Sequence, residues 1–476
     1  VSTDPMLARC SGAALRGMEA VEVTVEVDIA PGLPGLQVVG LPDAAVQEAR
    51  ERVRAAIRNS GLKVPLTRVV VSLAPADLRK AGPGFDLPMA LGLLVASGQL
   101  PASCLREIWS AAELGLDGRL RPIRGVLALA LAARRQRARA LLVPTGNAAE
   151  AALVEGLTVW SADDLAGAAR SLTKGEPLDA AAPRPAPVQG PPATGLAPDL
   201  ADVRGQVHGR RALEIAAAGG HHLILVGPPG SGKTMLARRL AGLLPPLSRA
   251  EALDLTRIHS IAGLLAEGGA LVNQRPFRSP HHSCSGAALI GGGTLPTPGE
   301  LSLAHHGVLF LDELAEFRRH VLDQLRQPLE EGEVWISRSR QRCRFPCQVT
   351  LVAASNPCPC GWFGDPHHVC CCGESVRRRY WSRLSGPLLD RIDLQVVMRR
   401  AAAQDLAEPY RSKAGPASED SFSVAGRVAM ARRRMAARNP QGCSNSQIPQ
   451  AALRRSLNLS SAALDLWEQT LERRQL

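Results

Sequence analysis

Long apolar runs, lysine and cysteine are all scarce in this sequence of 476 residues. No stretch approaches the roughly 18 consecutive apolar residues of a membrane-spanning helix, which argues against a transmembrane segment. Residues 1–17 lack the basic start and apolar core of a secretory signal. Eleven cysteines are few for this length, and five of them lie within Cys358–Cys372. We therefore expect a local cysteine site in a reducing cytoplasm rather than a disulfide scaffold.

Lysine is so rare that arginine supplies nearly all of the positive charge. The chain has 56 Lys and Arg, of which only 5 are Lys, and its net charge is +12. A positive balance of this size favours a polyanionic partner such as nucleic acid. An arginine-rich genome composition would give the same balance, so charge alone leaves the partner open.

A proline-rich stretch divides the chain. Residues 183–198 hold six prolines, and because proline fixes φ and donates no backbone N–H, we expect an extended spacer there. Before the spacer, alternating apolar residues predict strands over 21–29 and 67–75, and helical periodicity predicts helices over 46–61 and 87–98. After the spacer, apolar runs predict further strands, which lie at 222–227, 307–311 and 351–356.

The segment GPPGSGKT at 227–234 is the strongest local signal. It fits the pattern G-x-x-x-x-G-K-[ST] between a predicted strand, HLILV, and a predicted helix, MLARRLAGLL. Glycines let backbone N–H groups turn toward phosphates, and the helix N-terminus adds the positive end of its dipole. We expect Lys233 to reach the β- and γ-phosphates of a nucleotide, and Thr234 to offer its hydroxyl to Mg²⁺.

Acidic and amide side chains follow the next two predicted strands. Asp312 is placed to hold the Mg²⁺ shell, and Glu313 to polarise the attacking water. Asn356 ends the strand over 351–356 and could orient that water, contact the γ-phosphate or simply cap the strand. The predicted nucleotide-binding residues are Gly227, Pro228, Pro229, Gly230, Ser231, Gly232, Lys233, Thr234 and Asp312.

Several longer motifs resemble one family. GPPGSGKT, VLFLDEL, SNPCPCG and SRLSGPLLDRIDL are similar to the magnesium-chelatase-related AAA+ ATPases. RPFRSPHHSCSGAALIGGG at 275–293 and GELSLAHHGVLFLDEL at 299–314 resemble the ComM/YifB branch of that family. The resemblance covers nearly the whole chain and implies an ATPase that uses ATP and Mg²⁺.

The resemblance implies a Lon-protease-like (ribosomal S5 domain 2-like) α/β domain, followed by a P-loop AAA+ core and a helical lid. The expected parts are a Lon-like domain at 1–172, a linker at 173–199, the ATPase core at 200–397 and the lid at 398–476. A protease of this fold needs a serine and a lysine. The turn GPGFDLPMA at 82–90 contains no serine and PIRGVLALA at 122–130 no lysine, so we expect a scaffold and not a protease.

An arginine finger acting between subunits is also implied by the resemblance. It corresponds to Arg391, with Arg383 as the second candidate, and it implies a homo-oligomeric ring, expected to be a hexamer. A surface or ion-paired arginine is the alternative for Arg391. The family carries its second sensor arginine on a helix that would follow Leu476. Without that contact we expect weaker coupling of the γ-phosphate to the lid. A fragment of a longer protein, a frameshifted product and a member of reduced activity are the open alternatives.

Arginines recur at every second position of VWISRSRQRCRFP at 334–346, and these are Arg338, Arg340, Arg342 and Arg344. Such spacing places them on one face of an extended ribbon. Related ring ATPases insert a hairpin here, and four guanidinium groups in a pore would grip DNA phosphates without reading sequence. A solvated strand face is the alternative.

Cysteines cluster after Asn356 in two C-x-C pairs, and the preferred metal ligands among them are Cys358, Cys360, Cys370 and Cys372. Four thiolates at tetrahedral reach bind structural Zn²⁺. C-x-C is tighter than the usual C-x₂-C, so a reduced cluster and a redox-sensitive loop remain alternatives.

We interpret the chain as a cytoplasmic AAA+ ATPase that remodels single-stranded or branched DNA, by helicase-like branch migration in natural transformation or recombination. Two other hypotheses stay open. One is a chelatase-type motor that remodels a protein partner, and the other is a nucleotide-binding scaffold without turnover. No membrane partner is expected.

Overall fold

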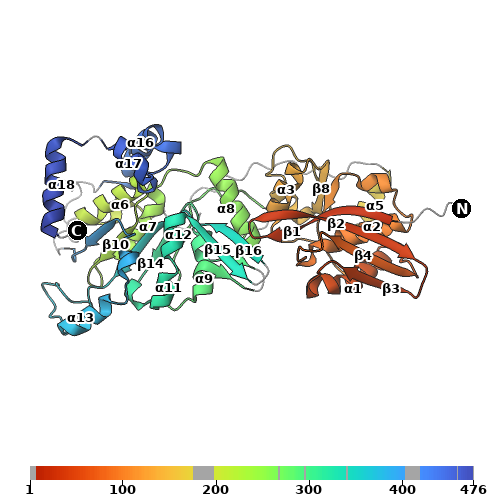
Figure 1. Cartoon of the computed structure of the whole chain (residues 1–476), viewed down its shortest axis with the longest axis horizontal. Helices are drawn as coiled ribbons and strands as arrows, with labels where there is room; N and C mark the ends of the chain where they lie inside the picture. The colour runs from red at the N-terminus through yellow and green to blue at the C-terminus, as the bar shows by residue number, and fades with distance from the viewer. Residues whose placement is uncertain are drawn as a thin grey trace.

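A computed structural model describes residues 7–174, 198–265, 269–293, 296–338, 341–401, 419–457 and 459–474. The expected spacer at 183–198 falls outside these residues except for Pro198. The described chain forms two α/β units that lie end to end along the long axis, with a group of helices beside the second unit (Figure 1).

The first unit is built on a seven-stranded mixed sheet of order β3-β4-β2-β1-β5-β8-β9. Its strands are β1 (Leu7–Arg16), β2 (Glu19–Ala30), β3 (Gly35–Val39), β4 (Arg68–Ala74), β5 (Ile108–Ser110), β8 (Ala140–Pro144) and β9 (Val159–Ala162). Its helices are α1 (Ala44–Asn59), α2 (Asp86–Ala96), α3 (Val126–Arg135), α4 (Thr145–Ala151) and α5 (Leu165–Lys174). The strands predicted over 21–29 and 67–75 and the helices predicted over 46–61 and 87–98 are confirmed as β2, β4, α1 and α2.

Helices cover both faces of this sheet. Ala140 and Leu142 of β8 join a core cluster with α1, α2 and α5, whereas Leu141 and Val143 join a cluster with α3 and α4. Because successive side chains of a strand point to opposite faces, the two clusters lie on opposite sides of the sheet. Two-sided burial explains why β8 reads ALLVP, without polar alternation.

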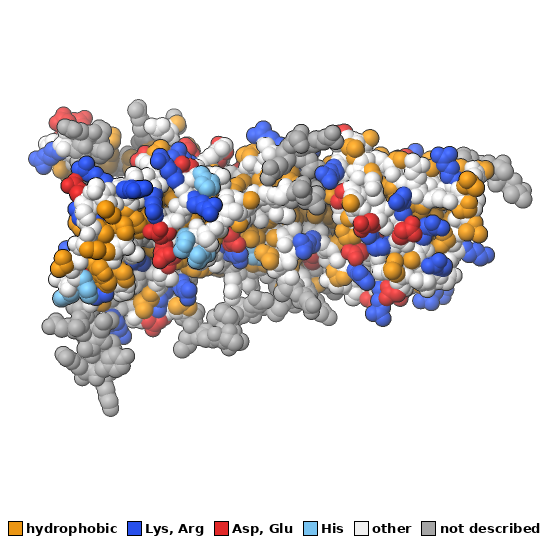
Figure 2. Space-filling view, turned by 90° about the horizontal axis from the view of Figure 1, so that it is seen from below, with side chains coloured by type: hydrophobic (Ala, Val, Ile, Leu, Met, Phe, Trp, Pro, Cys, Tyr) orange, Lys and Arg blue, Asp and Glu red, His pale blue; other side chains and the backbone are white. Residues whose placement is uncertain are grey.

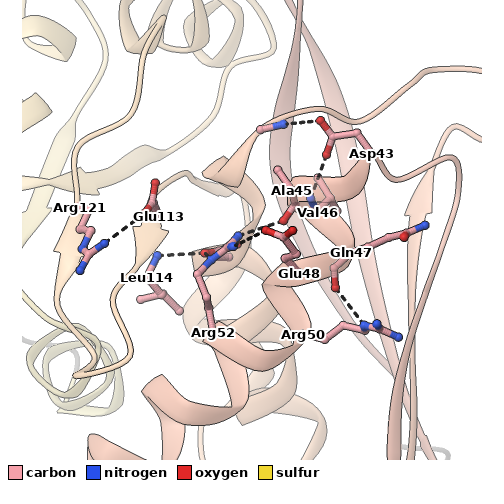
Figure 3. Close-up of polar contacts among 12 residues, drawn as sticks. Asp43, Ala45, Val46, Gln47, Glu48, Arg50, Arg52, Glu113, Leu114 and Arg121 are labelled. Carbon is pink, nitrogen blue, oxygen red and sulfur yellow. Dashed lines mark hydrogen bonds and ion pairs between the residues drawn. The ribbon is translucent and has the colours of Figure 1, made fainter.

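A buried ion pair fixes the start of α2, within the segment at 82–90 where no serine was found. Asp86 is fully buried, and Arg52 of α1 donates to it from Nε (2.7 Å) and Nη2 (3.0 Å). The Leu114 backbone N–H adds a third hydrogen bond at 3.1 Å. Figure 3 shows Arg52 reaching from α1 toward Leu114 and Ala45. Asp86, the first residue of α2, therefore has a structural role in holding α1 and α2 together.

The second unit has a five-stranded parallel sheet of order β11-β14-β17-β10-β18. The strands are β10 (Leu223–Val226), β11 (Phe277–Arg278), β14 (Val308–Leu311), β17 (Thr350–Ser355) and β18 (Leu394–Val397). The helices are α6 (Val207–Gly219), α7 (Lys233–Leu243), α8 (Arg249–Ala262), α9 (Gly286–Ile290), α10 (Glu300–Leu303), α11 (Arg319–Asp323), α12 (Arg326–Glu331), α13 (Glu374–Trp381) and α14 (Gly386–Leu389). The three strands predicted after the spacer are confirmed as β10, β14 and β17.

Helices also cover both faces of the second sheet. Val308 and Phe310 of β14 pack with α6 and α7, and Leu309 and Leu311 pack with α8 to α11. Because the strands are parallel, their carboxyl ends share one edge, so the segments that follow β10, β14 and β17 converge there. This convergence positions the candidate site.

A two-stranded hairpin, β15 (Glu333–Arg338) and β16 (Gln341–Pro346), lies between the two units near β1 (Figure 1). Its Cys343 contacts the β1–β2 turn, where a Cβ on Gly17 would lie 3.1 Å from the Cys343 Cβ. Met18 and Ala128 of the first unit belong to the core cluster of the second. The two units therefore share apolar packing in addition to their covalent connection.

The described residues at 419–457 and 459–474 are largely helical, with α16 (Ser421–Arg438), α17 (Gln450–Ser456) and α18 (Ser461–Arg474). Val424 and Val428 of α16 are buried against α6 and α7. No helix among the described residues has the length and apolar character required to span a membrane.

Candidate functional site

The glycine-rich segment connects β10 to α7 at the carboxyl edge of the second sheet. Gly230 and Gly232 have φ values of +74° and +86°, and a Cβ at either position would meet no atom within 4 Å. Glycine adopts this left-handed backbone without the steric cost that other residues meet. The loop leads directly into the start of α7, where the positive end of the helix dipole favours an anion.

Lys233 begins α7 and lies inside this loop. Its Nζ donates to the carbonyl oxygens of Gly227 (2.6 Å) and Pro228 (3.0 Å), and to Oδ1 of Asn356 (3.2 Å). Burial lowers the pKa of Lys233, while the nearby carboxylates of Asp312 and Glu313 act in the opposite direction. A cation that bonds to neutral oxygens is ready to exchange them for charged phosphate oxygens.

Thr234 and Asp312 lie side by side. The Thr234 hydroxyl donates to Oδ2 of Asp312 at 2.9 Å. A hydroxyl beside a carboxylate is an oxygen donor set that suits Mg²⁺, which binds few protein ligands and keeps water or phosphate oxygens. The Ser231 hydroxyl is buried and has no hydrogen-bond partner among the described residues. An unpaired buried hydroxyl in this loop fits a phosphate-binding site.

Glu313 is held by a histidine that the sequence analysis gave no role. Its backbone is left-handed, with φ +52°, and Oε2 lies 3.2 Å from Nδ1 of His282. The His282 ring lies tilted against His281, with the ring centroids 4.1 Å apart, and meets Phe317 edge-on at 6.4 Å. His282 lies in the motif RSPHHS, which the sequence analysis used only for the family resemblance. Nothing in that motif indicates that His282 approaches the end of β14.

Gln206 is a second residue that the sequence analysis did not single out. Its side-chain Nε2 donates to the backbone oxygens of Ser231 (3.0 Å) and Arg399 (2.5 Å), and its own backbone is left-handed at φ +52°. Gln206 therefore links the glycine-rich loop at 227–232, which we call the phosphate loop, to the segment that follows β18. Gln206 ends the stretch DVRGQ at 202–206, whose sequence does not indicate this contact.

Arg391 lies at the opposite edge of the sheet from the phosphate loop. It precedes β18, whose first residue, Leu394, pairs with Leu223 at the start of β10. Arg391 donates to the Pro387 carbonyl at 2.8 Å, forms an ion pair with Glu330 and lines a cavity of about 850 Å³. The phosphate loop follows the far end of β10, so Arg391 is placed away from the candidate site of its own chain.

Arg383, the second candidate, lies near the acidic strand end instead. Its Nη1 donates to the Ala315 carbonyl (3.0 Å) and to Glu316 (2.9 Å). The two arginines thus occupy different edges of the second unit.

The arginine hairpin exposes one face and buries the other. Arg342 and Arg344 are exposed; Arg342 lies over the Trp335 ring at 4.3 Å and Arg344 pairs with Glu333 at 3.1 Å. Val334, Ile336, Cys343 and Phe345 are buried on the other face. The side chain of Arg338 and the whole of Arg340 lie outside the described residues. On the face drawn in Figure 2, basic and acidic side chains alternate over both units rather than form one continuous basic patch.

The four preferred cysteines converge next to Asn356. Their Sγ atoms all lie within 4.8 Å of one another, and Cys358 is fully buried while Cys371 is exposed. A hydrogen bond from the Trp362 backbone N–H lowers the pKa of the Cys360 thiol to about 5. Because thiolate is the form that binds metal, this cluster could hold a soft divalent ion.

The fold and site together define an α/β protein with a parallel-sheet core, and a glycine-rich loop and acidic side chains meet at its carboxyl edge. Residues 199–406 match the family described as magnesium chelatase, subunit ChlI, and residues 25–147 match the family described as subunit ChlI of Mg-chelatase.

Similar proteins match most of the chain. An uncharacterised protein of Mycobacterium tuberculosis is 46% identical over 461 residues, covering 96% of this chain and 89% of the relative. The uncharacterised protein YifB of Escherichia coli is 46% identical, covering 88% of this chain and 80% of the relative. Competence protein ComM of Haemophilus influenzae is 48% identical, covering 80% and 74%. The chain belongs to the ComM/YifB family of magnesium-chelatase-like proteins.

Proposed function

We propose that this protein binds and hydrolyses ATP at the carboxyl edge of the second sheet. The observation that carries the proposal is the convergence of four groups from three strand ends: the phosphate loop with Lys233, the Thr234–Asp312 pair, Glu313 and Asn356. Binding would replace the carbonyl partners of Lys233 with phosphate oxygens.

Each of these residues has a defined task in hydrolysis. Lys233 neutralises the β- and γ-phosphates, and Asn356, already bonded to Lys233, orients the attacking water. Glu313 accepts the proton of that water. Thr234 and Asp312 would hold Mg²⁺, which supplies positive charge to the phosphate oxygens when bound.

Arg391 acts on a neighbouring subunit in this proposal. Its position at the opposite edge of the sheet, beyond reach of its own phosphate loop, supports an arginine finger supplied in trans. Such a contact requires a homo-oligomer, and by the family resemblance we propose a hexameric ring.

DNA is the proposed substrate of the motor, and helicase-like branch migration the proposed work. Three features support it: the net charge of +12, the exposed guanidinium groups of Arg342 and Arg344 on the hairpin, and the similarity to a competence protein. Exposed arginines of this kind bind phosphates without sequence preference. We also propose the Lon-like fold for the first unit, the lid role for the C-terminal helices, and Zn²⁺ for the four-thiol cluster.

The decisive experiment is steady-state ATP hydrolysis with and without single-stranded or forked DNA. We expect turnover that rises with DNA and is lost in Lys233→Ala, because the ammonium is the main cation at the phosphates. The double variant Arg342→Ala/Arg344→Ala should keep basal turnover and lose the stimulation.

Two results would contradict parts of this proposal. An ATP hydrolysis rate that is the same with and without DNA would favour the motor that remodels a protein partner. ATP binding without turnover in either condition would leave a nucleotide-binding scaffold.

A further inference from the structure

The loop that carries the four cysteines begins at the nucleotide site itself. Asn356, which bonds to Lys233, directly follows β17, and Cys358 lies two residues further on. The Trp381 indole N–H donates to the Pro357 carbonyl at 3.0 Å, and the Gly361 N–H donates to the Cys358 carbonyl at 2.9 Å. The first C-x-C pair is therefore rigidly joined to a residue of the nucleotide site.

The outer half of this loop is built to return the chain to its start. The Trp362 ring stacks on His368 at 4.2 Å, and Arg400 lies over Trp362 at 4.8 Å. Asp365 accepts hydrogen bonds from the backbone N–H groups of His367 (2.8 Å) and His368 (2.9 Å). These contacts shape the turn that brings Cys370 and Cys372 back to the first pair.

The spacing of the sulfurs matches a four-coordinate site. The Sγ of Cys358 lies 3.3 Å from that of Cys360 and 3.6 Å from that of Cys370. The Sγ atoms of Cys360 and Cys370 are 3.6 Å apart. Four sulfurs each about 2.3 Å from a zinc ion stand roughly 3.8 Å apart at tetrahedral angles. These are non-bonded distances, since all four cysteines are free. Only a small expansion of the cluster is needed to accept the ion.

The cysteine loop also touches the phosphate loop. Gly361 lies directly against Pro229, because a Cβ on Gly361 would come within 2.8 Å of the Pro229 Cδ and 3.0 Å of its Cγ. The backbone of Gly361 has φ +84°, so glycine is favoured there both for conformation and for space. Pro229 is thus supported by a turn that lies, along the chain, between the first C-x-C pair and the second.

We infer that zinc bound by Cys358, Cys360, Cys370 and Cys372 holds Gly361 against Pro229, so that the phosphate loop keeps its nucleotide-binding shape only while the metal is present. The metal would act at a distance from the phosphates, through the loop backbone. Without it, no metal–sulfur bond joins the two C-x-C pairs, because all four cysteines are free, and the turn loses the bonds that close it. The inference rests on the proposed nucleotide site.

The first test measures zinc and nucleotide binding together on the full chain. Zinc per chain is determined by mass spectrometry of the purified protein, and affinity is measured with a fluorescent ADP analogue and Mg²⁺. We expect one zinc per chain, loss of that zinc in Cys360→Ser, and an affinity at least about fivefold weaker in that variant. Cys371→Ser is the matched control, because Cys371 lies in the same loop and is exposed; it should change neither quantity.

Two further measurements separate the brace from a general loss of folding. A zinc-selective chelator should weaken analogue binding of the wild-type chain, and added Zn²⁺ should restore it. Gly361→Ala should keep its zinc and still bind the analogue at least about fivefold more weakly, because its Cβ displaces Pro229 and strains the turn.

The outcomes distinguish this inference from the proposed function. A wild-type chain without zinc overturns the metal site. Loss of zinc with unchanged nucleotide affinity overturns the brace alone and leaves the proposed ATPase standing. A zinc-loaded wild-type chain that binds no nucleotide overturns both.

Discussion

Glu313 shows how one residue combines strain and chemistry. It follows a buried strand, adopts a left-handed backbone and places its carboxylate against His282. Non-glycine residues in this conformation are uncommon and cluster at functional sites. The histidine bond gives the carboxylate a fixed direction at the edge where the attacking water is expected.

We predict that His282 positions Glu313 for hydrolysis without taking part in nucleotide binding. His282→Ala should lower kcat by roughly tenfold or more, since a misdirected base is costly, while analogue affinity stays unchanged. Steady-state kinetics and a binding titration check both quantities. His281→Ala is the control, because His281 bonds to Ser283 at 2.8 Å instead. Equal loss in both variants would show that the pair only supports the local fold.

The site residues show what sequence can and cannot locate. The phosphate loop, Asp312, Glu313 and Asn356 were predicted from local patterns, because each directly follows an apolar strand of a parallel sheet. Gln206 and His282 reach the same edge of the sheet, but neither directly follows one of these strands, so strand prediction does not locate them. Their contacts depend on tertiary packing, which spacing along the chain does not encode.

At the scale of elements, α1 and α2 depend on one buried charge pair. Asp86 is fully buried and accepts two hydrogen bonds from Arg52 and one from Leu114. Removing one partner of a buried pair leaves the other charge without compensation, which is more costly than losing the pair.

Arg52→Ala is therefore predicted to lower the free energy of unfolding of the first unit by about 3 kcal/mol. Chemical denaturation followed by circular dichroism measures this change. Arg119→Ala removes an exposed partner of Asp117 and should cost less than about 1 kcal/mol. Similar losses in the two variants would contradict the importance of burial.

Strands and helices with a clear period were predictable, whereas several elements were not. The alternation in β2 and the helical period in α1 are visible because one face of each meets polar surroundings. By contrast, β1 was not predicted. It pairs with β2 over its whole length, and this pairing depends on the fold rather than on the sequence of β1 alone. The alternation of arginines in the hairpin is visible in the sequence. Its contact with the β1–β2 turn could not be predicted, because that contact forms only when the two units pack together.

At the scale of the whole molecule, each chain is proposed to hold an incomplete site. The phosphate loop and Arg391 lie at opposite edges of the second sheet, so one chain cannot bring both to the same nucleotide. We predict that ATP turnover per chain rises with protein concentration until assembly is complete.

Mixing variants tests the same arrangement. Lys233→Ala and Arg391→Ala should each be inactive alone, and a mixture should regain activity because some interfaces combine an intact loop with an intact finger. Sedimentation measured at the same concentrations provides the control for assembly. Turnover per chain that is independent of concentration would contradict an arginine supplied in trans.

The seating of the arginine hairpin on the first unit has a mechanical consequence. Cys343 rests on the Gly17 turn, and Met18 is part of the core beneath the hairpin. A pull on Arg342 or Arg344 is therefore resisted by both units, and not by the hairpin alone. Any stroke that displaces the hairpin along a polymer must either carry the first unit with it or first break this apolar contact.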